Sequence, residues 1–343
     1  MAYESVTRNG TGFALRAKAK GSMAMVNKRD MEYWDNATTV TEFVLVGLSK
    51  QPQVRAALFV LFLVMYAVAI AGNGLIVVLI VVDSHLHTPM YFFLSNLSFI
   101  DISYVTTTVP QMLVHCFKEK PIIPLGNCFA QMNIALFLGV AECLLLAVMA
   151  YDRFVAICSP LHYSLIMSRR VCLMLAVGLC IISFLLTIVP YLSMPAARLC
   201  GRNVVNHFTC ELQAVLKLAC SDTHTSGLSM LITSVFTLLF PFAFILVTYG
   251  RIGLAVLRIR SAQGRGKALS TCGSHLTVVG IFYGTALAAY LKPQAKTFTD
   301  TDKIVAVFYA VIAPMLNPLI YSLRNKDVQG ALWRLIGGKL PLP

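Results

Sequence analysis

The chain has 343 residues, of which 57% are hydrophobic and only 13% are charged. Soluble proteins carry roughly 25% charged residues, so this composition excludes a soluble domain of this size and is typical of a membrane protein. Lysine and arginine outnumber aspartate and glutamate by 28 to 15, but much of this excess lies in short loops between apolar runs, where it orients a chain in a bilayer and does not indicate nucleic-acid binding.

The N-terminal tail comprises residues 1–55. Residues 1–30 are basic and poor in apolar side chains, so we predict that they are disordered or form an upstream extension. Residues 1–50 contain no compact apolar core of a cleavable signal peptide, so the first membrane helix would act as the targeting signal. Asn36-Ala-Thr38 is a glycosylation sequon just before the first apolar run, and Asn9 begins another.

Seven apolar segments follow in residues 56–323. They lie between residues 55 and 83, 89 and 117, 127 and 151, 170 and 198, 222 and 251, 267 and 292, and 303 and 324. Each reaches the ~20 residues that a helix needs to cross a bilayer. Backbone groups in lipid must be satisfied internally, and β-barrel strands are shorter and alternate in polarity. The sequence therefore predicts an all-α membrane protein with a seven-transmembrane helix bundle.

The loops indicate the orientation of the bundle. The connection after the fifth segment is basic from Arg251 to Lys267 and contains no acid, whereas the loop at Lys118–Lys120 mixes signs. Positively charged loops stay in the cytoplasm, so we expect an extracellular N-terminus and a cytoplasmic tail at residues 324–343. Within that tail, residues 327–336 have apolar positions at helical spacing, which predicts a short amphipathic helix on the inner leaflet.

The third segment ends at an acid-base pair, Asp152-Arg153, and the chain turns only at Pro160. A helix of this length would deliver both side chains to the membrane edge, where Asp152 can hold the Arg153 guanidinium until a conformational change releases it. The alternative is an ordinary arginine whose side chain reaches up to the lipid headgroups.

Four strings in this order resemble the signature of the olfactory (odorant) receptor family of rhodopsin-like G-protein-coupled receptors. They are LHTPMYFFL (86–94), MAYDRFVAIC (149–158), KALSTCGSHL (267–276) and PMLNPLIYSLRN (314–325). The resemblance covers about residues 36–335. Phe154 departs from the tyrosine that is usual after Asp-Arg, and residues 1–30 have no counterpart in the family pattern.

This resemblance implies an odorant receptor of the plasma membrane whose partners are a small volatile ligand, membrane lipid and the olfactory stimulatory G protein, with a rise in cyclic AMP. It implies that Asp152 and Arg153 serve coupling and that Tyr249 meets Arg153 after rearrangement. Asn317-Pro318, followed by Tyr321, would form a bend that a ligand can bias. A plain structural kink is the alternative.

Four cysteines fall at the outer end of the bundle. Cys128 begins the third segment, and Cys200, Cys210 and Cys220 lie in the loop after the fourth. Disulfides persist on this oxidising side, and four cysteines allow three pairings. The family pattern pairs Cys128 with Cys210, and Cys200 with Cys220.

Two acids, Asp101 and Glu142, lie within the second and third apolar segments. Ionisable residues at membrane depth usually face the bundle interior and are functional. We predict a sodium or proton site near Asn73 and Asn317, which the family resemblance also suggests. The alternative is two protonated acids that are hydrogen-bonded to neighbours.

The ligand site is predicted from helix faces that the resemblance places inside the outer half of the bundle. These faces carry Leu136, Gly139 and Val140; Thr233, Ser234 and Thr237; and Tyr283, Ala286, Leu287 and Tyr290. An apolar pocket with a few hydroxyls suits a small neutral ligand. An amine is disfavoured, because Ala135 stands where amine receptors carry an acid.

Other function classes fit less well. The histidines show no zinc-type spacing, and no nucleophile elbow, phosphate loop or catalytic carboxylate pair is present in the sequence. We therefore predict neither an enzyme nor a bound cofactor, apart from the sodium ion. A transporter would show internal repeats, which an odd number of spans does not favour. A chemoreceptor of the same fold that acts outside the olfactory epithelium stays an alternative.

Overall fold

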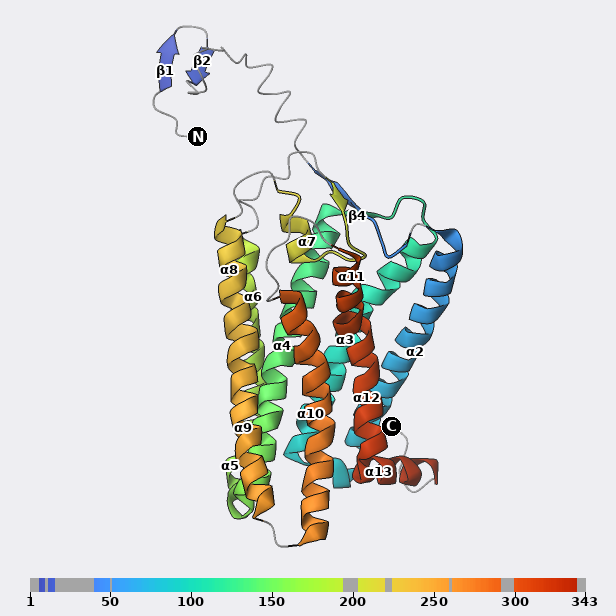
Figure 1. The fold of residues 1–343 in the computed structure, drawn as a ribbon, viewed down its shortest axis with the longest axis vertical. Coiled ribbons are helices and arrows are strands. Elements are labelled where there is room, and N and C mark those ends of the chain that lie inside the picture. Colours follow the sequence, from blue (N-terminus) through green and yellow to red (C-terminus); the bar gives the residue numbers. More distant parts are fainter. Residues whose placement is uncertain are drawn as a thin grey trace.

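The structure is a computed structural model that describes residues 6–9, 12–15, 40–49, 51–193, 203–219, 224–258, 261–290 and 299–337. In this part of the chain, seven long helical rods stand side by side and confirm the predicted bundle (Figure 1). They are α2 (Pro52–Val82), α3 (Pro89–Cys116), α4 (Leu125–Cys158), α6 (Arg169–Ser193), α8 with α9 (His224–Ser234, Phe240–Leu257), α10 (Ala262–Tyr290) and α11 with α12 (Asp300–Val307, Ala313–Arg324).

Six of these rods are long and apolar enough to cross a membrane, judged on the described residues. The remaining rod, α3, is 28 residues long, and at 1.5 Å per residue it extends about 42 Å, which is enough to span the hydrocarbon. Its buried polar side chains, Ser98, Asp101 and Thr108, face the bundle interior, where α3 packs between α2 and α4. All seven predicted spans are therefore present as helices.

Two rods contain a widened, π-helical turn. The turns are η4 (Val235–Leu239), which joins α8 to α9, and η5 (Phe308–Ile312), which joins α11 to α12. Each lies just before a proline, Pro241 or Pro314. Proline has no N–H and clashes with the carbonyl four residues earlier, which here lies inside the widened turn, so the turn relieves the clash.

One end of the bundle, which we call the outer end, carries a small sheet. Strand β3 (Glu42–Leu45) lies between antiparallel β4 (Ile122–Pro124) and parallel β5 (Val204–Val205). Phe43, Leu45, Ile123 and Val205 are buried beneath it, together with residues of the short helix α7 (Leu212–Leu216). The sheet thus ties the segment before α2 to the loop after α6.

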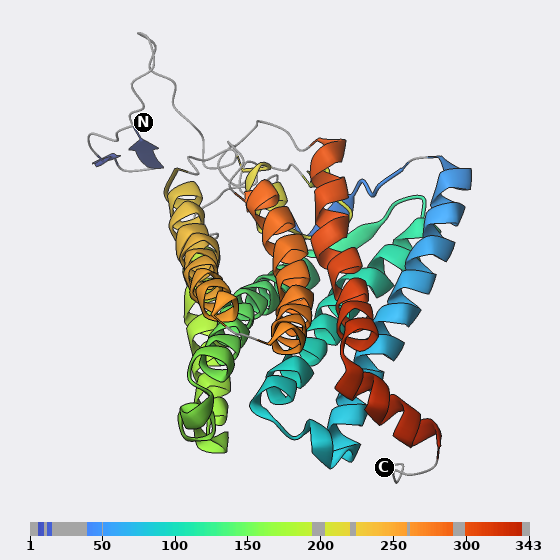
Figure 2. The same ribbon diagram turned by 60° about the horizontal axis from the view of Figure 1, so that its bottom comes forward.

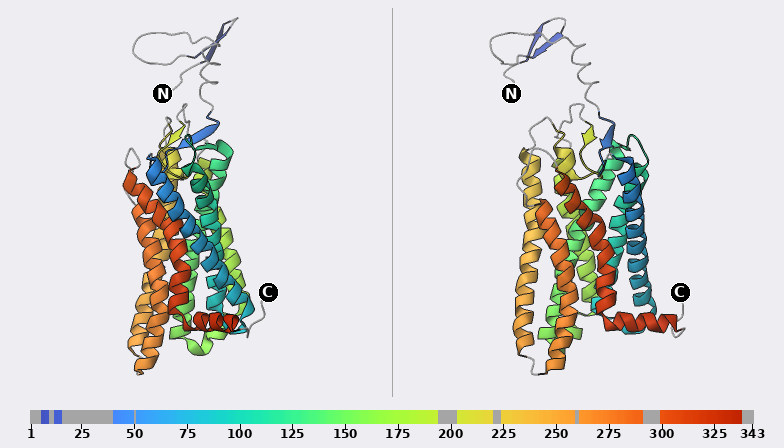
Figure 3. Two further views of the ribbon diagram at one scale, coloured as in Figure 1. Left: turned by 90° about the vertical axis from the view of Figure 1, so that its right-hand side faces the viewer. Right: turned by 45° about the vertical axis from the view of Figure 1, so that its right-hand side comes forward.

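The opposite, inner end carries four further short elements. They are η1 (Ser84–Leu86), η2 (Pro160–His162), α5 (Tyr163–Ile166) and α13 (Lys326–Ile336). Helix α13 lies across the bundle axis (Figure 3). It buries Val328 and Ala331 and exposes Trp333 and Ile336, so the predicted amphipathic helix is confirmed and begins one residue earlier than expected.

Two further differences from the sequence prediction concern helix ends. Helix α4 continues past Tyr151 to Cys158, and α10 begins at Ala262, before Lys267. In the N-terminal tail, β1 (Val6–Asn9) and β2 (Gly12–Leu15) pair as an antiparallel hairpin, within the range for which composition predicts disorder. The sequon at Asn36 lies outside the described residues.

Candidate functional site

One cavity in the outer half, which we call the ligand cavity, lies among α4, α8, η4, α10 and η5. Figure 2 shows α10 standing between the α8–α9 rod and the α11–α12 rod. The ligand cavity encloses about 690 Å³ with its mouth included, which suits a small molecule. Its wall is mostly apolar, with a few hydroxyls and one acid. It is lined by Tyr104, Ala135, Leu136, Gly139, Val140, Glu142, Cys143, Leu212, Met230, Thr233, Ser234, Thr237, Leu238, Phe282, Ala286, Tyr290 and Tyr309.

Eight of the ten residues predicted to bind ligand line this cavity: Leu136, Gly139, Val140, Thr233, Ser234, Thr237, Ala286 and Tyr290. The other two do not. Tyr283 is fully buried below the cavity, where its hydroxyl donates to the Cys143 carbonyl at 2.9 Å. Leu287 packs on the main hydrophobic core at the flank of α10.

Several lining residues were not predicted from the sequence. Tyr104 lies on α3, Leu212 follows Cys210 in the outer loop, and Tyr309 lies in the widened turn η5. The Cys128–Cys210 pairing could have indicated that Leu212 covers the bundle. No simple spacing signal points to Tyr309, because the widened turn changes which residues of this rod face inward.

An upper chamber of about 540 Å³ adjoins this cavity and shares seven lining residues with it, among them Tyr104, Tyr290 and Tyr309. Its roof includes Glu211, whose Oε2 lies 3.3 Å from Nε2 of His207. The outer loop thus supplies an acid near the ligand site. On α4 itself, Ala135 stands at the position considered above for the acid that would bind an amine ligand.

A disulfide holds the outer loop over the cavity. Cys128 on α4 is bonded to Cys210, with the two Cα atoms 5.3 Å apart, which confirms this predicted pair. The Gln131 side chain reinforces the link: its Oε1 accepts a hydrogen bond from the Cys210 N–H at 3.0 Å, and its Nε2 donates to the Thr107 carbonyl. Cys200 and Cys220 lie outside the described residues.

The two intramembrane acids, Asp101 and Glu142, are buried, and Glu142 also lines the ligand cavity. The Asn317 amide donates to both oxygens of Asp101, at 3.1 and 3.0 Å. The Asn73 amide donates to the carbonyls of Ala69 and Pro314, each at 3.0 Å. The structure therefore brings Asp101 and Asn317 into direct contact.

Two buried oxygens near this contact, Oε1 of Glu142 and Oδ1 of Asn73, have no hydrogen-bond partner among the described residues. Buried acceptors that stay unpaired need an explanation. A set of carboxylate and amide oxygens matches the ligands that hard cations prefer, so the donor set fits a small cation. A group of three or more His, Cys, Asp or Glu side chains that could hold a metal is not found in the described part of the chain.

At the inner end of α4, Arg153 lies against Asp152, with Nη2 and Oδ2 3.7 Å apart. Asp152 is buried and accepts a second contact, a 2.8 Å hydrogen bond from the Tyr163 hydroxyl. The acid of the pair is thus fixed by α5 as well as by its neighbour. The Asp152–Arg153 pair that sequence spacing predicts is therefore present, and Asp152 restrains the Arg153 guanidinium.

Two tyrosines face this region. Tyr249 on α9 is hydrogen-bonded to Nδ1 of His275 at 2.8 Å, and the two rings stack. The hydroxyl of Tyr321 on α12 is buried and has no hydrogen-bond partner among the described residues. In this arrangement Tyr249 binds the α10 histidine, and Tyr321 retains a free donor.

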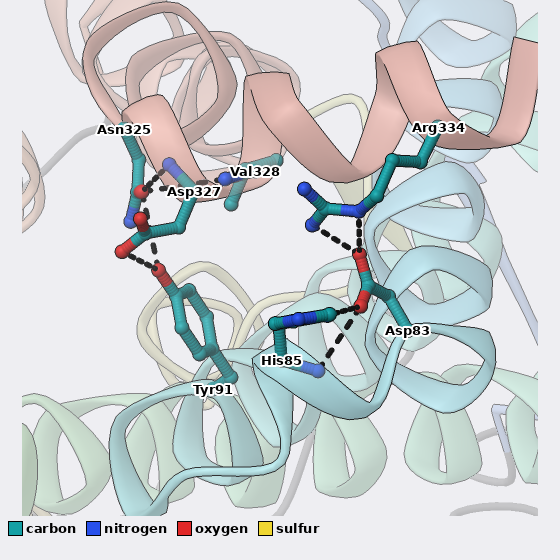
Figure 4. Close-up of polar contacts among 7 residues, drawn as sticks. All are labelled: Asp83, His85, Tyr91, Asn325, Asp327, Val328 and Arg334. Carbon is teal, nitrogen blue, oxygen red and sulfur yellow. Dashed lines mark hydrogen bonds and ion pairs between the residues drawn. The ribbon is translucent and has the colours of Figure 1, made fainter. Parts of the chain in front are cut away.

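A second polar cluster, which the sequence did not predict, attaches α13 to the bundle (Figure 4). Asp83 at the end of α2 is fully buried and accepts from Nε of Arg334 at 3.0 Å and also from its Nη2. Nδ1 and the backbone N–H of His85 bind the other carboxylate oxygen. Burial alone would raise the pKa of Asp83, but the bonds from Arg334 and His85 outweigh it and hold the pKa below its ordinary value.

The other end of α13 is fixed by Tyr91. Its hydroxyl lies 3.1 Å from Oδ1 of Asn325 and 3.1 Å from Oδ2 of Asp327 (Figure 4). Asn325 also caps α13, because its side chain accepts from the backbone N–H of Asp327. Hydrogen bonds from the inner ends of α2 and α3 therefore hold α13 at both of its termini.

Comparisons with known proteins agree with this architecture. The olfactory receptor family model matches residues 62–339. Human olfactory receptor 13H1 is 52% identical over 302 residues, which cover 88% of this chain and 98% of that protein. Mouse olfactory receptor 5AR1 is 48% identical, with coverage of 89% and 98%.

The fold itself matches the crystal structure of squid rhodopsin, with a TM-score of 0.64 over 84% of this chain and 86% of that chain, at 19% identity. The helices of the bundle indicate a multi-pass membrane protein, and the matched receptor family implies a small-molecule ligand and a G-protein partner. Since a family model and relatives of about half identity match most of the chain, it belongs to the olfactory receptor family and is a receptor, not an enzyme.

Proposed function

We propose that this receptor detects a small, neutral, volatile molecule in the cavity of its outer half and signals through a stimulatory G protein, raising cyclic AMP. The observation that carries the proposal is the cavity itself, which eight residues predicted from helix faces line together. Its wall offers an apolar surface with the carboxyl group of Glu142 and six hydroxyl-bearing side chains: Thr233, Ser234, Thr237, Tyr104, Tyr290 and Tyr309. Such a site favours an apolar ligand with one hydrogen-bonding group.

The ligand would act by favouring one arrangement of the bundle over another, because binding shifts an equilibrium only through differential affinity. The widened turn η5 supports this, since Tyr309 within it lines the cavity while α12 beyond it carries Asn317, Pro318 and Tyr321. A change at the cavity wall can thus reach the inner end along one rod.

At the inner end, release of Arg153 from Asp152 would complete the transition. Tyr249 would leave His275 and, with Tyr321, meet the freed guanidinium, which then contacts the G protein. Both hydroxyls are hydrogen-bond acceptors that suit a guanidinium. The buried oxygens of Asp101, Glu142 and Asn73 would hold a sodium ion in the resting arrangement.

We place the receptor in the plasma membrane with its N-terminus outside. The start of α6, the end of α9 and the start of α10 lie on the same side of the bundle as α13. These helix ends carry five cations: Arg169, Arg170, Arg251, Arg258 and Arg265. The positive-inside rule assigns that side to the cytoplasm. Antibody labelling of an N-terminal epitope on unpermeabilised cells tests this assignment.

The function is tested by measuring cyclic AMP in cells that express the receptor, across a panel of neutral volatile molecules. We expect at least one concentration-dependent response, and we expect Arg153→Ala to abolish it at equal surface expression. Arg169→Ala, which removes an exposed cation at the start of α6, serves as the matched control. A response that survives Arg153→Ala unchanged would contradict the coupling mechanism.

A further inference from the structure

A second cavity lies at the outer end, between the segment around β3, the start of α2 and the end of α3. It measures about 980 Å³ with its mouth included. It shares no lining residue with the ligand cavity, and only Phe208 with the upper chamber. It is therefore a separate site on the side of the bundle away from α8 and α10.

The floor of this second cavity is apolar. Phe62 on α2, Met112 on α3 and Phe208 from the outer loop are each at most 5% exposed, and Leu45 and Leu58 complete the surface. A floor of this kind accommodates an alkyl chain through apolar burial.

The mouth of the cavity is charged. Arg55 and Lys118 contribute two positive charges and Glu119 one negative charge, so the charged side chains sum to +1 when His115 is neutral. A single negative charge on a ligand would balance this mouth. A cationic ligand would be repelled, and a neutral ligand would leave the positive charge of the mouth unbalanced.

Arg55 is held in place by the end of α3. Its Nη2 donates to the carbonyls of Lys118, at 2.7 Å, and His115, at 3.3 Å. Its Nε and Nη1 make no hydrogen bond to a described residue, so part of the guanidinium fork stays available. A pre-positioned fork with unused donors matches the geometry of a carboxylate or phosphate.

His115 supplies a second unsatisfied polar atom at the same cavity. Its Nδ1 is buried and has no hydrogen-bond partner within the part of the chain that the structure describes. A buried polar atom without a partner usually marks a missing ligand or water. Arg55 and His115 thus both present unused hydrogen-bonding capacity above an apolar floor.

We propose that this cavity binds an anionic amphiphile, a single negatively charged headgroup on an alkyl chain. The headgroup meets Arg55 and His115 at the mouth, and the chain lies on Leu58, Phe62 and Met112. Two sources share this chemistry, a free fatty acid and the headgroup region of an anionic membrane lipid.

The probe is radiolabelled dodecanoate, measured for saturable binding to the whole receptor in phosphatidylcholine nanodiscs. We expect dodecanol, with the same chain and no charge, to compete at least about tenfold more weakly, since hydrogen bonds to charged groups contribute ~1.5–3 kcal/mol. Dodecyl phosphate should compete comparably with dodecanoate. Equal competition by dodecanol, or no saturable binding, would overturn the proposal.

Three variants locate the bound probe. Arg55→Gln removes the charge but retains donors for the α3 carbonyls, and it should weaken dodecanoate at least about tenfold. Leu58→Trp fills the floor of the cavity without changing its charges, and it should also weaken dodecanoate binding. This variant tests the proposal if Arg55→Gln does not fold. Gly139→Leu, which fills the ligand cavity instead, should leave dodecanoate binding unchanged. Loss of binding in Gly139→Leu with retention in Leu58→Trp would place the probe in the ligand cavity and refute the second site.

A lipid arm separates the two sources. Nanodiscs that contain phosphatidylserine should reduce dodecanoate binding to the parent receptor if membrane lipid occupies the site, and they should leave it unchanged if only free acids enter. Either result agrees with an anionic amphiphile, provided that the Arg55→Gln receptor shows the same loss in both lipids. A phosphatidylserine effect that persists undiminished with Arg55→Gln would refute the assigned headgroup contact.

Discussion

The two ends of the bundle are held together by different kinds of interaction. At the outer end a disulfide, a three-stranded sheet and apolar side chains enclose empty space. At the inner end, buried acids are paired with arginine, histidine and tyrosine, and α13 is fixed across the bundle. The outer end is thus built to keep a cavity open, while the inner end depends on polar contacts that can be exchanged.

This difference matters for signalling, because a covalent link holds one geometry whereas hydrogen bonds to ions can change partners at modest cost. Arg153 has one acid partner that is itself shared with Tyr163. A bistable inner end beneath a fixed outer frame is what a receptor needs to convert a small contact change into a rearrangement.

The largest expected effect comes from breaking the outer frame. Cys210→Ser should remove most folded receptor from the cell surface, because a native disulfide typically contributes ~2–5 kcal/mol. Surface labelling by flow cytometry measures this loss. The double variant Cys128→Ser, Cys210→Ser is the control, because it lacks the disulfide but leaves no unpaired thiol at Cys128. Its surface level should be as low as that of the single variant if loss of the bond is the cause.

The second prediction concerns the ligand cavity alone. Gly139→Leu places a side chain in the cavity and should raise the ligand concentration for half-maximal cyclic AMP response at least about tenfold, since lost contacts of ~1–3 kcal/mol are expected for such changes in an apolar pocket. Gly178→Leu on α6 is the matched control, because the space beside Gly178 is open. Equal potency of both variants would mean that the ligand binds elsewhere.

How far these features follow from the sequence depends on the range of the interaction. The helices and the Asp152-Arg153 pair follow from local runs and spacing, so they could be predicted, and the Cys128–Cys210 bond from family resemblance. The contact of Asp83 with Arg334 joins residues 251 positions apart, and no local pattern indicates it. The same limit explains Tyr283: helical spacing placed it on the ligand face, but only the packing of α10 on α4 shows that its hydroxyl binds Cys143.

The third prediction tests the inner end. Arg334→Gln should lower the free energy of unfolding by about 2–3 kcal/mol, because it leaves the fully buried Asp83 carboxylate with only His85. Asp83→Asn should cost less, since it removes the buried charge itself. Thermal unfolding of the purified receptors measures both. If Asp83→Asn were the more harmful change, the bond to Arg334 would not be what holds α13.

The smallest expected effect lies where the two ends meet, at the close approach of α2 and α12. A Cβ atom on Gly72 would come within 2.9 Å of Pro318 Cγ, whereas one on Gly74 meets nothing within 4 Å. Gly72→Ala should therefore cost about 1–2 kcal/mol through overpacking, while Gly74→Ala should be neutral or slightly stabilising, because alanine favours a helix. Because the added methyl group presses on Pro318, Gly72→Ala should also change the basal cyclic AMP level, which Gly74→Ala should leave as in the parent. Equal melting temperatures and equal basal signals for the two variants would show that α12 tolerates the added methyl group at Pro318, and that the predicted bend at Asn317-Pro318 does not control the inner end.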